Sequence, residues 1–99
     1  MALHKNFING EWVAGAEAKE NINPSDVSDI VGEYTQADKV QTEAAIAAAQ
    51  AAQPGWASTT PQQRADILET AGIELLARKD EIGRVLSREE GKPLANGIA

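Results

Sequence analysis

The stretch Phe7-Ile8-Asn9-Gly10-Glu11-Trp12-Val13 carries the strongest short structural signal in the chain. An Asn-Gly pair tolerates the positive φ angles of a tight type I′ turn, and apolar residues flank this pair on both sides. We therefore predict a β-hairpin here, with Asn9 and Gly10 at its turn.

The β pattern continues after the hairpin. Residues 15–20 are small and polar, which predicts a loop. Residues 22–24 are expected to be extended, because a residue before proline is pushed away from the helical region. Ser and Asp side chains in 25–29 can satisfy their own backbone and indicate a turn, and residues 30–34 predict a short strand. The first 37 residues should therefore form a small β element.

From Asp38 onward the period becomes helical. Asp38 is a suitable N-cap, the run to Ala52 consists almost entirely of good helix formers, and Pro54 with Gly55 is expected to end that helix. Residues 60–63, Thr-Pro-Gln-Gln, then combine a capping box with proline at the first helical position. The apolar positions of this second helix fall at three- and four-residue spacing and make one face: Ala65, Leu68, Gly72, Leu75 and Leu76.

A third and a partial fourth helical pattern follow. Asp80 is expected to cap a third helix that holds Ile82, Val85 and Leu86. Gly91, with Pro93 two residues later, should end it. Residues 94–99 restart a helical pattern and stop on an apolar pair, for which truncation of a longer chain is the simplest expectation.

Composition limits the function classes. Ninety-nine residues make one domain at most, and the 42% hydrophobic content is dominated by small side chains, so an independent fold should be weak. The net charge of −6 disfavours nucleic acid and anionic membranes as partners. The absence of cysteine excludes disulfides and thiol nucleophiles. Without a signal peptide or an apolar run of about 18 residues, a cytoplasmic protein is expected.

No residue makes a case for catalysis by itself. The glycines fit neither a dinucleotide-binding nor a P-loop pattern, and Gly91-Lys92 is better explained as a helix end, because Leu86 stands where a P-loop glycine belongs. His4 is the only histidine, so it can form neither a metal site nor a catalytic pair with another histidine. A Ser-His-Asp arrangement would have to use His4 as its base, because the chain has no second histidine. This applies to each of the candidate serines, Ser25, Ser28 and Ser58.

The remaining candidates have structural explanations. Glu89 and Glu90 point about 100° apart on a helix and do not converge on a substrate. Glu74–Arg78 and Asp80–Arg84 have the spacing of surface ion pairs. The alanines of 44–52 could accept a partner helix, but helix propensity and internal packing explain them better. Two tryptophans, Trp12 and Trp56, could stack on a ligand but more often anchor a small core or an interface.

Five segments in order resemble the aldehyde dehydrogenase superfamily. They are the opening hairpin at 7–13, the Asn-Pro element at 22–24, the alanine-rich helix at 45–49 with Trp56 after it, the Arg-Ala-x-Ile-Leu helix at 64–68, and the Glu-Gly-Lys-Pro turn at 90–93. Each motif is weak alone, but the series is specific and covers nearly the whole chain. The sequence of residues 25–34 resembles that of the bacterial branch that acts on α-ketoglutaric semialdehyde (2,5-dioxovalerate).

The resemblance implies an α/β parent fold in which residues 1–99 are the N-terminal part of the nucleotide-binding domain, with a β-hairpin and strand in 1–37 and about three helices in 38–99. The full enzyme would use NAD or NADP to oxidise an aldehyde, would be a homo-oligomer and would bind neither nucleic acid nor membrane. In this family a cysteine thiolate attacks the aldehyde, hydride passes to the nicotinamide, and a glutamate-activated water releases the acid. Those residues lie beyond residue 99, so no catalytic, cofactor-binding or metal-binding residue is assigned here, and the chain alone is expected to be inactive.

A second hypothesis is a stand-alone helical interaction module without catalytic activity. Such a module would unfold cooperatively and form a defined oligomer. A dehydrogenase segment would instead expose the apolar faces of its helices at 61–79 and 82–90 and bind a hydrophobic dye or aggregate. A small acidic carrier or regulator is a third class, but the sequence offers no modification site that would support it.

Overall fold

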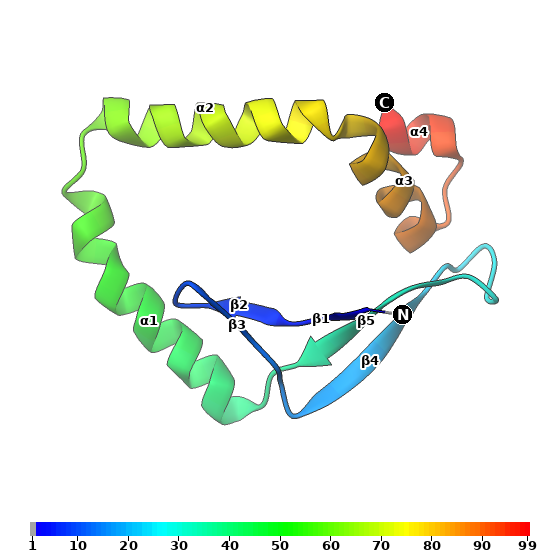
Figure 1. The fold of residues 1–99 in the computed structure, drawn as a ribbon, viewed down its shortest axis with the longest axis horizontal. Coiled ribbons are helices and arrows are strands. Elements are labelled where there is room, and N and C mark those ends of the chain that lie inside the picture. The colour runs from blue at the N-terminus through cyan, green and yellow to red at the C-terminus, as the bar shows by residue number, and fades with distance from the viewer. Residues whose placement is uncertain (1) are drawn as a thin grey trace. The chain divides into compact units, whose positions relative to one another are not determined.

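The structure is a computed structural model that describes residues 2–99. Its strands are β1 Leu3–His4, β2 Asn6–Ile8, β3 Glu11–Val13, β4 Glu17–Ile22 and β5 Ile30–Gln36. Its helices are α1 Lys39–Ala57, α2 Pro61–Ala77, α3 Lys79–Glu90 and α4 Leu94–Ile98 (Figure 1). The expected β element followed by helices is confirmed, with five strands and four helices in the described residues.

The chain divides into two compact units. The first holds the residues up to Asn21 together with Gly32–Ser58, and the second holds Ile22–Val31 together with Thr59–Ala99. Unit 1 thus contains most of the strands and α1, whereas unit 2 contains the turn region after β4 and the helices α2, α3 and α4.

The predicted hairpin of unit 1 is confirmed. Strands β2 and β3 pair antiparallel, with Phe7 opposite Trp12. The turn residues Asn9 and Gly10 have φ angles of 52° and 78°. Positive φ at both central positions defines the type I′ turn that the Asn-Gly pair favours. The Phe7 and Trp12 rings lie 4.7 Å apart and tie the two strands together across one face.

A three-stranded sheet has the order β1-β5-β4, and β1 runs parallel to β5. The loop predicted over residues 15–20 is therefore wrong, because β4 begins at Glu17. Strand β4 pairs with β5. Just before β4, Ala16 N–H donates to Gln36 O at 3.0 Å, and Gly15 N–H donates to Thr35 Oγ1. A Cβ on Gly15 would overlap the Gln36 carbonyl, so this close approach requires glycine.

Helix α1 begins as predicted but ends later. The Asp38 carboxylate accepts a hydrogen bond from Gln41 N–H at 2.8 Å, which confirms the N-cap. The helix then continues through Pro54 to Ala57, so the predicted stop at Pro54 is wrong. Proline removes only its own N–H from the ladder, and its carbonyl still accepts from Ser58 N–H at 3.0 Å.

In unit 2, α2 opens with the predicted capping box. Thr60 Oγ1 accepts from Gln63 N–H, and the Gln63 side chain accepts from Thr60 N–H. Asp80 does not cap α3. Arg78 is both the C-cap of α2 and the N-cap of α3, and Asp80 lies in the first turn of α3. Gly91 ends α3 with φ 75°, as predicted.

The C-terminal helix packs closely on α3. A Cβ on Gly97 would overlap Ser87 Oγ, and a Cβ on Gly83 would lie 2.8 Å from the Cα of Ile98. Hydrogen at these two positions lets the backbones of α3 and α4 approach each other. This crossing covers Gly83 and Ser87, which are the buried residues of α3.

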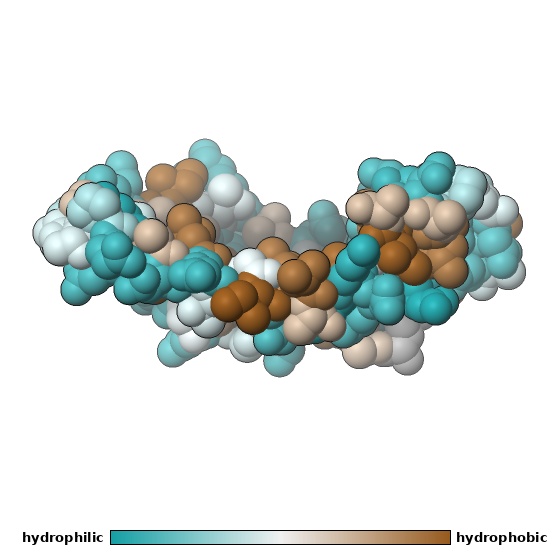
Figure 2. All heavy atoms as spheres, turned by 90° about the horizontal axis from the view of Figure 1, so that it is seen from above, coloured by the Kyte–Doolittle hydropathy of each residue, from teal (hydrophilic) through white to brown (hydrophobic). Residues whose placement is uncertain are grey.

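The described residues include no buried hydrophobic side chain; the buried side chains among them are those of Thr35 and Ser87. The sequence predicted a weak core of small side chains, and the described residues show even less apolar burial than that. Figure 2 views the molecule from the side on which α2 lies in Figure 1 and shows apolar residues at the surface among polar ones.

Surface ion pairs differ from those expected. Arg78 pairs with Glu81 at 2.7 Å, three residues along the helix, and this pair raises the pKa of Arg78 and lowers that of Glu81. Among the described residues the expected pairs Glu74–Arg78 and Asp80–Arg84 are not formed. Turning the chain at Arg78 brings its guanidinium to the first turn of α3.

None of the helices described here is long and apolar enough to cross a membrane.

Candidate functional site

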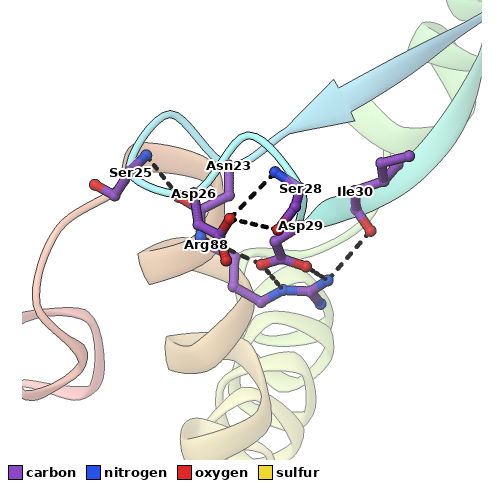
Figure 3. A network of polar contacts seen from close by, with 7 residues as sticks. All are labelled: Asn23, Ser25, Asp26, Ser28, Asp29, Ile30 and Arg88. Carbon is purple, nitrogen blue, oxygen red and sulfur yellow. Dashed lines mark hydrogen bonds and ion pairs between the residues drawn. The ribbon is translucent and has the colours of Figure 1, made fainter.

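A connected polar cluster lies in unit 2, where the turn region of residues 23–29 meets α3. Arg88 reaches from α3 to Asp29 with two hydrogen bonds, Nε to Oδ2 at 2.9 Å and Nη2 to Oδ1 at 2.7 Å. Its Nη2 also donates to Ile30 O at 3.3 Å (Figure 3). A guanidinium that meets a carboxylate in this two-pronged way fixes orientation as well as distance. Arg88 therefore holds the end of the turn region against α3.

The turn region is also tied internally. Asn23 Oδ1 accepts from Ser25 N–H at 2.9 Å, and Asn23 Nδ2 donates to Asp29 Oδ2 at 3.2 Å. Asp26 Oδ1 accepts from the N–H and the hydroxyl of Ser28 (Figure 3). These side-chain bonds to nearby backbone are those that make Asn, Asp and Ser favourable in turns. The turn predicted over residues 25–29 is confirmed.

The charge of Asp29 follows from this geometry. Its hydrogen bonds from Arg88 and then from Asn23 lower the pKa of the carboxyl from 3.8 to about 2, against a smaller opposing effect of burial. Donors to the ionised form favour that form. Asp29 is therefore a fixed anion and is not a candidate for general acid–base chemistry near neutral pH.

A hollow of about 280 Å³ lies beside this network, and its lining includes Ser25, Arg84, Ser87 and Lys92. The Ser25 hydroxyl donates to Gly91 O, and Lys92 Nζ lies 3.1 Å from a carboxylate oxygen of Glu90. Neither serine hydroxyl of the hollow contacts an imidazole: Ser25 bonds to the Gly91 carbonyl, and Ser87 Oγ lies 3.5 Å from Pro93 O. A serine needs an adjacent base to become a nucleophile, whereas the hydroxyls of Ser25 and Ser87 are directed to backbone carbonyls.

The other sequence candidates are not brought together. His4 stacks on Tyr34 with ring centroids 4.8 Å apart, in unit 1. The hydroxyl of Ser58 donates to Gly55 O at 2.9 Å and that of Ser28 donates to Asp26. In the described part of the chain, no three His, Asp or Glu residues cluster as a metal site would require.

The N-termini of α1, α2 and α3 carry capping or acidic side chains. A phosphate at a helix N-terminus needs free backbone N–H groups and no competing negative charge. The Asp38 carboxylate already occupies the N-terminus of α1, Thr60 and Gln63 occupy that of α2, and Asp80 and Glu81 lie in the first turn of α3. The positive-φ glycines, Gly10 and Gly91, serve a hairpin turn and a helix end.

Sequence reasoning missed the contact that organises this region. Asp29 and Arg88 are 59 residues apart, and each has an ordinary local role, one in a turn and one on a helix. The two groups of bonds that meet at Asp29 come from its own turn and from α3. The bonds from α3 could be predicted only by knowing that the turn packs on that helix.

Comparison with known proteins gives these features a context. The Aldehyde dehydrogenase family profile matches residues 12–98. The chain is 41% identical over 90 residues to an alpha-ketoglutarate semialdehyde dehydrogenase of Haloferax volcanii, and 40% identical over 89 residues to an N-succinylglutamate 5-semialdehyde dehydrogenase of Chromobacterium violaceum. These matches cover 89% of this chain in both cases, and 19% and 18% of the two relatives.

A solved structure agrees in three dimensions. The E. coli NADP dependent enzyme matches with a TM-score of 0.89 and 34% identity, over 96% of this chain and 20% of that one. The chain therefore belongs to the aldehyde dehydrogenase family, whose members are oxidoreductases acting on aldehydes. It spans about a fifth of the length of the relatives it matches.

Proposed function

We propose that residues 1–99 act as the N-terminal part of the nucleotide-binding domain of an NAD- or NADP-dependent dehydrogenase that oxidises a semialdehyde to a carboxylate. The observation that carries this proposal is the match in sequence and in three dimensions to dehydrogenases of about five times this length. Semialdehyde substrates are named for the Haloferax and Chromobacterium relatives.

Within that enzyme the segment would be a frame and not a reactive part. No candidate side chain in the described residues forms a nucleophile–base pair, and the N-termini of α1 and α2 are occupied by their own caps. The Arg88–Asp29 contact and the α3–α4 crossing hold unit 2 in a defined shape. Catalytic, cofactor-binding and metal-binding residues would all be supplied by other segments of the enzyme.

The absence of a hydrophobic core among residues 2–99 supports this role over a stand-alone helical module. A module that folds by itself buries an apolar core, whereas the described residues bury no large apolar side chain. We further propose a cytoplasmic homo-oligomeric parent that binds neither nucleic acid nor membrane, in keeping with the net charge of −6.

A chimera tests the proposal. Residues 1–99 would replace the matching segment of the Chromobacterium N-succinylglutamate 5-semialdehyde dehydrogenase, to which they are 40% identical. The chimera should reduce NAD⁺ or NADP⁺ with that semialdehyde at a rate within about tenfold of the parent enzyme, because under this proposal the exchanged segment supplies no catalytic residue. The parent enzyme with the segment deleted is the negative control.

The isolated chain should show no absorbance increase at 340 nm with the same semialdehyde and either cofactor. Turnover above background by the isolated chain would contradict the assignment of catalysis to other segments. A chimera that folds and assembles like the parent enzyme but has no activity would contradict the proposed role of residues 1–99.

A further inference from the structure

An open apolar groove lies in unit 2 where α2, α3 and α4 meet. Its volume is about 530 Å³, and its lining includes Leu75, Leu76, Ile82, Gly83 and Ile98. The side chains of α2 that line it are well exposed, with Leu75 at 59% and Leu76 at 71%. Lys79 adds a cation to the lining. The groove is thus mostly apolar and accessible.

Beyond the groove, exposed apolar side chains continue along α2. Leu68 lies seven residues before Leu75, on the same side of the helix, and is 67% exposed. A contiguous apolar strip of this kind on a soluble protein marks a surface that another element covers. The acidic residues Asp66 and Glu74 lie roughly 160° and 120° from Leu68 around the helix. Arg64 lies roughly 40° from Leu68, so this side of α2 also carries a cation.

Contacts within unit 2 arrange part of this surface. The capping box at Thr60 and Gln63 fixes the start of α2, and the contacts of Gly83 and Gly97 fix α4 against α3. A surface that is already arranged loses less conformational entropy when a partner covers it. The groove is therefore suited to bind a partner that is not joined to it covalently.

The comparisons indicate what covers it. The E. coli enzyme keeps the same arrangement over 96% of this chain, but that stretch is only 20% of its length. The matched segment is the N-terminal one in these relatives. The groove is also lined by Ile98 and Ala99, so in the longer relatives the polypeptide that follows leaves from the groove itself. The remaining four-fifths of a dehydrogenase is thus the occupant that the geometry favours over a second copy of this chain.

We infer that the groove of α2, α3 and α4 binds the rest of an aldehyde dehydrogenase polypeptide even when that polypeptide is a separate chain, so that the two pieces assemble into an active enzyme. This inference rests on the proposed function. It adds that the contact is strong enough to form without a peptide bond between the pieces.

Complementation tests it. The Chromobacterium enzyme without its matching N-terminal segment would be mixed, or produced together, with residues 1–99. We expect the two chains to co-elute in size-exclusion chromatography and to recover semialdehyde oxidation at least tenfold above either chain alone. The Leu75→Asp, Leu76→Asp double variant should lose at least tenfold of that recovered activity. Thr70→Asp, which adds a charge on the same helix roughly 140° from Leu75, should retain it.

A spectroscopic readout separates binding from folding of the variants. The chain has no cysteine, so Leu76→Cys gives a single labelling position for a polarity-sensitive fluorophore. Emission of this label should shift to the blue when the truncated enzyme is added, and that of Thr70→Cys should not. The inference is overturned if the chimera is active while the separate chains neither co-elute nor shift the label, or if residues 1–99 pair only with themselves. An inactive chimera would instead overturn the proposed function.

Discussion

The turn region of residues 23–29 and the helix α2 are held in opposite ways. The turn region is polar, and its position depends on Arg88, 59 residues away in sequence. Helix α2 is capped by its own residues Thr60 and Gln63 and has no buried residue. One element is ordered by a distant partner and the other by its own sequence.

This contrast shows that unit 2 lacks the stabilisation that burial of its apolar side chains would give. Polar contacts and one close helix crossing order unit 2, while its large apolar side chains remain at the surface. Burial of apolar surface is the main favourable term in folding, so elements that keep it exposed depend on a further partner. In this family that partner is the remaining dehydrogenase polypeptide under our proposal.

The largest expected effect concerns the whole chain. Residues 1–99 alone should enhance the fluorescence of 1-anilinonaphthalene-8-sulfonate and lose ellipticity gradually on heating, because no apolar core makes the transition cooperative. The Leu75→Asp, Leu76→Asp variant should bind less dye. A sharp melting transition with no dye binding would show that α2 is covered in the isolated chain.

The next effect concerns α3 and α4. Gly97→Val should detach α4, because the new side chain would overlap Ser87 Oγ, and such overpacking costs about 1–3 kcal/mol. Amide exchange over Leu94–Ile98 should approach that of an unstructured peptide. Gly72→Ala is the matched control, since a Cβ there meets nothing within 4 Å, and it should leave α4 unchanged. Retained protection of α4 in Gly97→Val would refute the close crossing.

A narrower effect is expected at the turn region. Arg88→Gln should raise the pKa of Asp29 from about 2 toward 3.8, because its largest hydrogen-bond donor is lost. The Asp29 pKa is depressed in the folded chain, so its contribution to stability is complete above pH 3.8 and is lost as the pH falls toward 2.

Carbon-13 titration of the Asp29 carboxyl measures this change directly. In Arg88→Gln the acid-induced increase in amide exchange of the turn region should be smaller, because the folded-state pKa of Asp29 then lies close to its ordinary value. Arg84→Gln, on the same helix, is the control and should leave the titration as it is. An unchanged Asp29 pKa in Arg88→Gln would mean that Asn23 alone holds the carboxylate.

The smallest effect concerns the start of α2. Thr60→Ala should destabilise this helix by ~1 kcal/mol, because the cap to Gln63 N–H is lost. Circular dichroism should show a small loss of helix, and Thr60→Ser should restore it. No difference between the alanine and serine variants would mean that α2 is held by tertiary contacts and not by its own cap.

Sequence reasoning succeeded where the deciding atoms are close in the chain. The hairpin at Asn9-Gly10, the caps at Asp38 and Thr60, and the end of α3 at Gly91 are confirmed. Each depends on the φ preference of a residue or on a hydrogen bond spanning three or four residues. The family was identified in the same way, from five short motifs in order, and the profile match confirms it.

Sequence reasoning failed where a hydrogen-bonding partner is far away in sequence, or where one residue caps two consecutive helices. Strand β4 was missed because its ladder partners come from β5, and the cap at Asp80 failed because α2 and α3 meet at Arg78. Pro54 does not end α1, since its carbonyl still accepts a hydrogen bond.

By itself, then, the sequence determined the family, the hairpin and the starts of α1 and α2, because local backbone preferences and short-range hydrogen bonds specify them. Only the tertiary structure decided that Arg88 fixes the turn region through Asp29 and that Gly83 and Gly97 bring α3 and α4 together. It also decided that the leucines of α2 stay open to solvent. Each of these depends on which segments meet in space, and a pattern along one chain does not encode that meeting until the segments pack.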